Sequence, residues 1–358
     1  MAKRKRKSVY SGIGGQAVLE GVMMKNKEEY AVAIRKADGN IDVSMHKLAY
    51  NPESLIRKIP FVRGVIAFID SLSLGMDILT FSATEAEEEE EPTAGDRLLE
   101  KIFGSKTDAV VTGFTVVLSL LFAILLFMVL PYFVSELAGR YLKDQTLVLL
   151  IEGILRIVVF LIYVAAIALM KDIKRLYMYH GAEHKCINCI ESGRTLNLKN
   201  VRRSSRFHKR CGTSFMIFIV LIGIVLCFFI KTDSRLLRIA YRLLLIPVIA
   251  GISYELLRLA GRNDSFLLAV ISAPGLWMQR ITTKEPDDDM IEVAIAATEA
   301  VFDWEEFQNR HFTSKVVKRK RKEPDGSMVE TDEETLEISV KEIEEYLEEK
   351  RRNDQGEV

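Results

Sequence analysis

The stretch AVVTGFTVVLSLLFAILLFMVLPYF, residues 109–133, decides the class of this protein, because it contains no charged residue. A helix of this length is long enough to cross the hydrocarbon core of a bilayer, which is about 30 Å thick. Further apolar segments follow at residues 146–170, 213–230 and 236–257. The sequence therefore predicts a mainly α-helical, polytopic membrane protein with about four transmembrane helices.

Two other segments are apolar but do not fit a simple crossing. Residues 265–281 are short and contain Pro274 and Gly275, so we expect an interfacial or re-entrant piece. In residues 60–82, apolar side chains recur at helical spacing with charged residues between them. This pattern predicts an amphipathic helix that lies on the membrane or packs against a partner helix.

The chain begins with a small soluble element. Strand-like runs at residues 30–34 and 41–43 flank Asp38 and Gly39, a pair typical of a β-hairpin turn. No apolar segment follows the basic residues Lys3 to Lys7, which excludes a secretory signal peptide. We therefore expect an N-terminal region that stays in the cytoplasm and carries a β-hairpin.

The 49 basic and 49 acidic residues cancel, so net charge excludes no class of partner. The charged residues nevertheless separate from the apolar ones and divide the chain. The predicted regions are an N-terminal region (1–58), an amphipathic helix with an acidic linker (59–108), a transmembrane domain (109–264) with a cytoplasmic loop (171–212), an interfacial segment with a cytoplasmic amphipathic helix (265–312), and a charged, largely disordered tail (313–358).

Lysine and arginine collect between the second and third predicted spans, in residues 171–212, whereas the loop between the first two spans offers only Arg140 and Lys143. Because basic flanks resist translocation, residues 171–212 are predicted to be cytoplasmic. Four spans then place both termini in the cytoplasm of a bacterial inner-membrane protein. The basic run 202–210 favours anionic lipid headgroups as partners, and no nucleic acid is expected.

Charged residues inside the spans require partners, since an isolated charge in hydrocarbon is costly. Glu152 and Arg156 are one helical turn apart, and Arg242 should lie at a similar depth on an antiparallel helix. These positions predict a structural ion pair between helices, with a transport pathway as the less favoured alternative.

The motif H-x-x-E-H stands at His180, Glu183 and His184, where the second span is expected to continue as a helix into the cytoplasm. Two histidines one turn apart on a helix face the same way and can hold one metal ion. Glu183 can then act as a base, as in the inverted zinc-protease motif.

Further metal ligands follow at Cys186, Cys189, His208 and Cys211. In a reducing compartment they favour a metal, zinc above all, over disulfides. Two arrangements remain open: a closed structural zinc site made from these four residues, or an open site in which His208, Cys211 or a carboxylate joins the two histidines of the motif. Glu255, at the cytoplasmic end of the fourth span, is an optional ligand whose simpler interpretation is an ion pair with Arg258 or Arg262.

Four ordered strings resemble a bacterial membrane family, the domain of unknown function 1385: GGQAVLEGVMM (14–24), YHGAEHK (179–185), SRFHKRCGTSF (205–215) and KEPDDD (284–289). The resemblance covers residues 14 to about 300 and implies a metal-dependent enzyme without a known reaction. The family pattern does not include Cys186 and Cys189, which favours the open or mixed site. The residues that match it are Gln16, Glu20, Gly21, His180, Glu183, His184, His208 and Cys211.

Two functions of different classes are compatible with these patterns. The first is metal-dependent hydrolysis at the cytoplasmic membrane surface, with Glu183 as the base. The second is a non-enzymatic membrane scaffold in which a structural zinc ion locks the 171–212 loop and the charged ends recruit membrane-protein partners or a second copy. Metal transport is a weaker third class, because the spans contain no ligand pairs.

Overall fold

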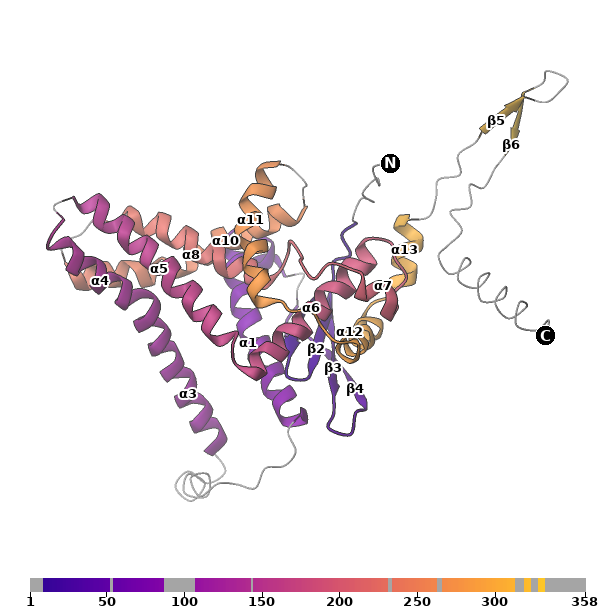
Figure 1. Cartoon of the computed structure of the whole chain (residues 1–358), viewed down its shortest axis with the longest axis horizontal. Helices are drawn as coiled ribbons and strands as arrows, with labels where there is room; N and C mark the ends of the chain where they lie inside the picture. Colours follow the sequence, from indigo (N-terminus) through magenta and orange to yellow (C-terminus); the bar gives the residue numbers. More distant parts are fainter. Residues whose placement is uncertain are drawn as a thin grey trace.

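A computed structural model describes residues 9–51, 54–86, 107–142, 144–230, 234–262, 266–312, 319–322 and 328–331. Within these residues the fold is mainly helical, and its elements form two regions (Figure 1). Long apolar helices make up one region, and a small sheet flanked by helices makes up the other. The basic stretch Lys3 to Lys7, most of the acidic linker and most of the tail lie outside the described residues, apart from a short hairpin of β5 (Arg319–Lys322) and β6 (Met328–Thr331).

The sheet has four antiparallel strands in the order β1-β2-β3-β4. They are β1 (Gly14–Val18), β2 (Gly21–Asn26), β3 (Glu29–Arg35) and β4 (Ile41–Lys47). The predicted hairpin is β3 with β4, and Gly39 has a φ of 87° at its turn. The prediction omitted β1 and β2, because β2 opens with four buried residues in a row and shows no alternation of apolar and polar side chains.

Helices cover both faces of the sheet. Val22, Met24 and Ala33 join one apolar core with α6 (Lys171–Glu191) and α12 (Asp288–Val301). Met23 and Val32 point to the opposite face, where Ile78 of α1 (Val62–Ala86) packs against them. The sheet thereby connects the helix that carries the H-x-x-E-H motif to a helix rich in exposed apolar residues.

Helix α1 has the two faces expected of an amphipathic helix. Leu74, Ile78 and Phe81 pack on the sheet, while Ile69 and Met76 are 58% and 45% exposed. The segment Val62–Glu85 is also long and apolar enough to cross a membrane. Close packing fixes its start, since a Cβ atom on Gly64 would come within 2.9 Å of the Gly251 Cα atom.

The first two predicted spans are helical. The first comprises α3 (Thr107–Ile124), the π-helical turn η3 (Leu125–Val129) and α4 (Leu130–Gly139), and the second is α5 (Gln145–Ile167). Pro131 explains the wide turn, because proline has no N–H group and its ring clashes with the carbonyl group one turn earlier. The chain turns at residues 168–170 before α6, so the H-x-x-E-H helix is separate from the second span and does not continue it.

Four helical segments are long and apolar enough to cross a membrane: Val62–Glu85, Gly113–Gly139, Thr146–Ile167 and Ala240–Ala260. The number of these segments agrees with the prediction, but they are not the same four segments that were predicted. The predicted span 213–230 is the shorter apolar helix α8 (Gly212–Phe228), and 236–257 is divided into α9 (Arg235–Leu244) and α10 (Ile246–Arg262). The division lies next to Pro247, which cannot donate a backbone hydrogen bond.

Residues 265–281 were expected to be an interfacial or re-entrant piece, because they are short and contain Pro274 and Gly275. They form one helix, α11 (Phe266–Thr282), that continues through the proline. A Cβ atom on Gly275 would come within 2.5 Å of the Ser214 hydroxyl oxygen, so the glycine allows α11 to cross α8 closely. The short elements η1 (Leu55–Lys58), α7 (Leu198–Arg202) and α13 (Trp304–Phe312) complete the described helices.

The predicted ion pair between helices is confirmed. Glu152 accepts hydrogen bonds from Arg156 at 3.0 Å and from the Arg242 Nη2 atom at 2.8 Å. Arg242 is 2% exposed and also lies over the ring of Tyr132. One carboxylate thereby joins α5 to α9.

Candidate metal centre

Helix α6 presents the two histidines of the motif on one face. His180 and His184 are one turn apart, and the centroids of their rings are 4.4 Å apart. The helix is anchored closely to the chain after α11: a Cβ atom on Gly181 would come within 2.0 Å of the Lys284 carbonyl oxygen. A larger residue at position 181 would push that segment away from the histidines.

Backbone carbonyl groups fix the tautomer of both imidazoles. The Nδ1 atom of His180 lies 2.9 Å from the Thr282 oxygen, and that of His184 lies 2.6 Å from the Arg206 oxygen. Because a carbonyl oxygen only accepts, each Nδ1 atom must carry the hydrogen. In the neutral rings the Nε2 atoms are left with free lone pairs, the state in which histidine binds metals.

Cys211 supplies a third soft donor from the start of α8. Its sulfur lies 3.1 Å from the Nε2 atom of His180, and it accepts the Thr213 backbone N–H as the N-cap of the helix. Donor atoms of His180, His184 and Cys211 all lie within 4.8 Å of one another. Three chain segments therefore converge on one point: α6, the start of α8 and, through Thr282, the end of α11.

The electrostatics of this group favour a thiolate. Burial raises the pKa of the Cys211 thiol, but the charges of His180 and His184 outweigh that effect and hold the pKa well below its usual value. Burial lowers the pKa of His180, whereas the neighbouring Cys211 raises it, with a net value of about 9. Both shifts favour charge separation between His180 and Cys211, and a metal ion would take the place of the proton that the two side chains compete for.

Glu183 lies beside the two histidines as a buried side chain on the wall of a cavity. It is 5% exposed, and no hydrogen bond or ion pair of Glu183 is found among the residues that the structure describes. It lines a cavity of about 570 Å³ together with His180, His184 and Cys211. A Cβ atom on Gly15 would come within 2.8 Å of its Cγ atom, so β1 packs directly against this side chain.

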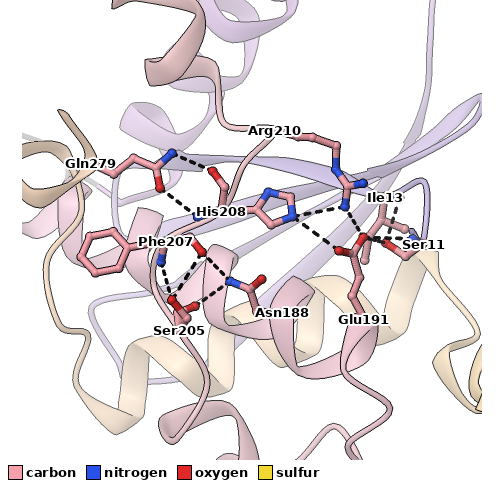
Figure 2. A network of polar contacts seen from close by, with 9 residues as sticks. All are labelled: Ser11, Ile13, Asn188, Glu191, Ser205, Phe207, His208, Arg210 and Gln279. Atoms are coloured by element: carbon pink, nitrogen blue, oxygen red, sulfur yellow. Dashed lines mark hydrogen bonds and ion pairs between the residues drawn. The ribbon is translucent and has the colours of Figure 1, made fainter. Parts of the chain in front are cut away.

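His208 lies next to the three donors but outside their group. The centroid of its ring is 5.6 Å from that of His184, while its Nε2 atom lies 3.6 Å from Glu191 and 3.3 Å from Arg210 (Figure 2). Glu191 is 4% exposed in its side chain and also accepts the Ser11 backbone N–H at 3.0 Å. The predicted ligand is therefore part of a polar network that ties the N-terminal segment to the end of α6.

Gln279 of α11 holds the backbone of His208 on both sides. Its Oε1 atom accepts the His208 N–H at 2.8 Å, and its Nε2 atom donates to the His208 carbonyl at 2.7 Å (Figure 2). A second donation, at 3.1 Å, reaches Ser214. Since Gln279 is fully buried, this clamp fixes the segment that carries Cys211.

Cys186 and Cys189 are not brought to the site. Both are fully buried in the apolar core that α6 shares with the sheet and α12. Burial raises the pKa of the Cys186 thiol well above its usual value and that of Cys189 to about 11. Protonated thiols in an apolar core are poor ligands, and the predicted four-residue closed site is not assembled.

The other candidate residues have structural partners or line the cavity. Glu255 pairs with Arg63 of α1, so the expected ion pair exists but with a different arginine. Glu20 pairs with Arg175 and accepts from Tyr179, whereas Gln16 lines the cavity. Gly21 allows close strand pairing, because a Cβ atom there would come within 2.3 Å of the Ala33 oxygen.

The charged motifs beside the site are paired with each other. Asp287 is the N-cap of α12, a position that favours acidic residues, and Asp288 pairs with Arg202. Arg206 lies 4.0 Å from Glu285, and Arg210 pairs with Glu191. These three arginines of the basic run are therefore engaged within the folded protein.

Sequence reasoning missed Glu191, Gln279 and the two carbonyl groups that orient the histidines. The sequence contained a signal for Glu191 and for Gln279. Glu191 follows His184 at a spacing of seven residues, on the same face of α6, and Gln279 is a polar residue inside an otherwise apolar segment. The carbonyl groups carry no signal, because every residue has one.

The donor set fits zinc. Two imidazole nitrogens and one thiolate sulfur suit a borderline transition metal and not magnesium or calcium, which prefer oxygen. Three protein ligands leave one tetrahedral position for another group. The hydrogen bonds from Nδ1 to backbone carbonyl groups are the usual outer support of such ligands.

Comparison with known proteins places this chain in a family. A model of the family "Protein of unknown function (DUF1385)" matches residues 59–304. The chain is also 38% identical over 307 residues to the uncharacterized protein YqhQ of Bacillus subtilis (strain 168), a match that covers 82% of this chain and 92% of that protein. No solved structure matches. The chain belongs to the DUF1385 family.

Proposed function

We propose that this chain is a membrane protein that binds zinc, or another divalent transition metal, through His180, His184 and Cys211. We further propose that it hydrolyses a substrate at the cytoplasmic membrane surface. The observation that carries this proposal is the position of the three donor atoms, within 4.8 Å of one another on the wall of a cavity of about 570 Å³. A purely structural site would be closed by a fourth protein ligand.

The residues around the donors have distinct roles in this proposal. A bound ion would supply a Lewis acid that makes water nucleophilic near neutral pH. Thr282 and Arg206 hold the two imidazoles through their carbonyl groups. Glu183 lines the cavity beside His180 and His184, and in this proposal it takes the proton from the attacking water and returns it to the leaving group.

The location follows from the helices and the basic residues. Four helices are long and apolar enough to span the cell membrane, and the segment that carries the donors is rich in lysine and arginine. Because such segments stay inside, we place residues 171–212 and the site in the cytoplasm, together with the sheet and α12, which share one core with α6. Since the sheet packs against α6, an even number of the three candidate helices between them crosses the membrane in this proposal.

The test exchanges Glu183 for Gln, which keeps the shape of the side chain and removes the base. The variant should retain about one equivalent of metal by elemental analysis of detergent-purified protein, yet fail to complement a deletion strain, since loss of a general base typically costs about 10²–10⁴ in rate. Glu306→Gln on the exposed side of α13 is the control and should complement fully. Full complementation by Glu183→Gln would replace this proposal with a scaffold that carries a structural zinc ion.

A further inference from the structure

A second cavity meets the first one at the site. It measures about 650 Å³, against about 570 Å³ for the cavity described above, and both volumes are typical of ligand pockets. His180 and Glu183 line both cavities. The other residues common to the two are Gly15, Gln16, Ala67, Ser71, Arg210, Gly212 and Tyr254.

The second cavity is mostly apolar and lies among the apolar helices. Its walls come from α1, α8 and α10, with α6 and β1 closing it toward the site. Two of these walls, α1 and α10, contain segments long and apolar enough to span a membrane. The apolar residues that line it include Phe68, Leu72, Leu176, Phe215, Met216 and Leu257.

The first cavity is polar and bears basic side chains. Three of its guanidinium groups are neutralised, because Arg57 pairs with Asp70, Arg63 with Glu255, and Arg210 with Glu191. Two ammonium groups line the cavity as well and have no carboxylate partner among the residues that the structure describes. They belong to Lys25, which donates to the Tyr50 hydroxyl at 2.9 Å, and to Lys27 in the turn between β2 and β3.

We propose that the substrate is a membrane lipid with an anionic, phosphate-bearing headgroup. The headgroup lies in the polar cavity against Lys25 and Lys27, and an acyl chain occupies the apolar cavity between α1 and α8. The bond between headgroup and chain then lies beside Glu183, where the cavities meet. This inference rests on the proposed hydrolysis. Water cleaves an ester bond of the lipid to give an acid and an alcohol, and no other reactant is needed.

Binding can be measured without turnover. Full-length Glu183→Gln protein in detergent is titrated with a fluorescent short-chain phosphatidylglycerol. The competitors are unlabelled phosphatidylglycerol, phosphatidylcholine with the same acyl chains, and free glycerol phosphate. We expect phosphatidylglycerol to compete at least about tenfold better than either, because only it satisfies both cavities. The Lys25→Gln, Lys27→Gln double variant should weaken binding about tenfold or more.

A bulky residue at the junction tests the apolar cavity. Ala67→Trp should abolish lipid binding, whereas Ile69→Trp on the exposed face of the same helix should leave it unchanged. Metal content must be equal in both variants, which shows that the site is folded. Equal binding of phosphatidylcholine, or glycerol phosphate as effective as the lipid, overturns the inference, as does lipid binding that survives Ala67→Trp.

The two proposals fail separately. If phosphatidylglycerol binds as described but the wild-type protein releases no product from it and Glu183→Gln still complements, the lipid site stands and the hydrolase does not. If Glu183→Gln fails to complement while no lipid of the series binds, the hydrolase stands and its substrate belongs to another class.

Discussion

Two buried polar clusters in this chain each contain a glutamate and differ in the space around it. In the apolar helices, Glu152 is held between Arg156 and Arg242, and the adjacent space is only about 10 Å³. At the candidate metal centre, His180 and Glu183 line cavities of about 570 and 650 Å³. In the first cluster one carboxylate ties two guanidinium groups together with almost no space beside them, whereas the residues of the second line space that another molecule can enter.

The difference shows how a structural cluster is distinguished from a site. A charge buried in an apolar region needs a partner, and the Glu152 carboxylate has two, in a space of about 10 Å³ that is too small for a ligand. At the candidate metal centre the Nδ1 atoms of both histidines are held by carbonyl groups, and donor atoms of His180, His184 and Cys211 lie within 4.8 Å of one another. This arrangement leaves the donors available to a ligand that is not part of the protein.

The largest effect is expected at the closed cluster. Glu152→Leu leaves two arginines without their shared carboxylate, so the free energy of unfolding in detergent should fall by about 3–5 kcal/mol while any metal bound stays unchanged. Glu306→Gln breaks an exposed pair on α13 and should cost less than about 1 kcal/mol. If the two losses were equal, the cluster would not be a structural tie between α5 and α9.

Loss of a metal donor at the candidate metal centre should lower metal affinity strongly and the stability of the metal-free protein only weakly. His184→Ala or Cys211→Ser should lower metal affinity by more than the roughly 10–100-fold typical of outer-shell changes, with a smaller effect on unfolding of the metal-free protein than Glu152→Leu. Elemental analysis after dialysis against a chelator measures the occupancy.

The matched control for that experiment is Cys186→Ala with Cys189→Ala. Both cysteines lie in the apolar core, so metal content should remain near the wild-type value although the core loses packing. Metal loss in this pair, with retention in His184→Ala, would favour the closed four-residue site and remove the contrast between the two clusters.

The same two clusters show what the sequence could and could not predict. The ion pair of Glu152 was predictable, because a charge in an apolar helix has few places to find a partner and the antiparallel order places Arg242 nearby. The face shared by His180 and His184 was also predictable from helical spacing. Both depend on local periodicity, which is a property of the sequence itself.

The ligand set depended on packing and was less predictable. Cys186 and Cys189 stand two and five residues after His184, yet helical geometry turns them into the core, while Cys211 reaches the site through the clamp of Gln279. Helix α1 shows the same limit. Its spacing indicates two faces, but only the sheet, whose strands β1 and β2 were not predicted, shows what one face covers.

The smallest effect is expected at the polar network that ties the N-terminal segment to the end of α6, and this effect depends on pH. Burial raises the pKa of Glu191, but the neighbouring His208 and the charge of Arg210 outweigh burial and hold the pKa below its usual value. The folded state therefore prefers the carboxylate more than the unfolded state does, in which the pKa is about 4.3. The stabilisation is complete above that value and is lost as the pH falls through the lower pKa of the folded state.

Glu191→Gln should accordingly lower the free energy of unfolding by about 1.5 kcal/mol at pH 7, the lower end of the range for hydrogen bonds to a charged group. The difference from wild type should shrink steadily below about pH 4.3, because wild-type Glu191 then becomes neutral as well. Denaturant titrations of metal-free protein from pH 3 to pH 7 measure it, with Glu306→Gln as an exposed control whose effect stays small throughout. If the difference in free energy of unfolding between wild type and variant were constant from pH 7 to pH 3, Glu191 would act through its shape and not through its charge. The link between the N-terminal segment and the candidate metal centre would then not be electrostatic.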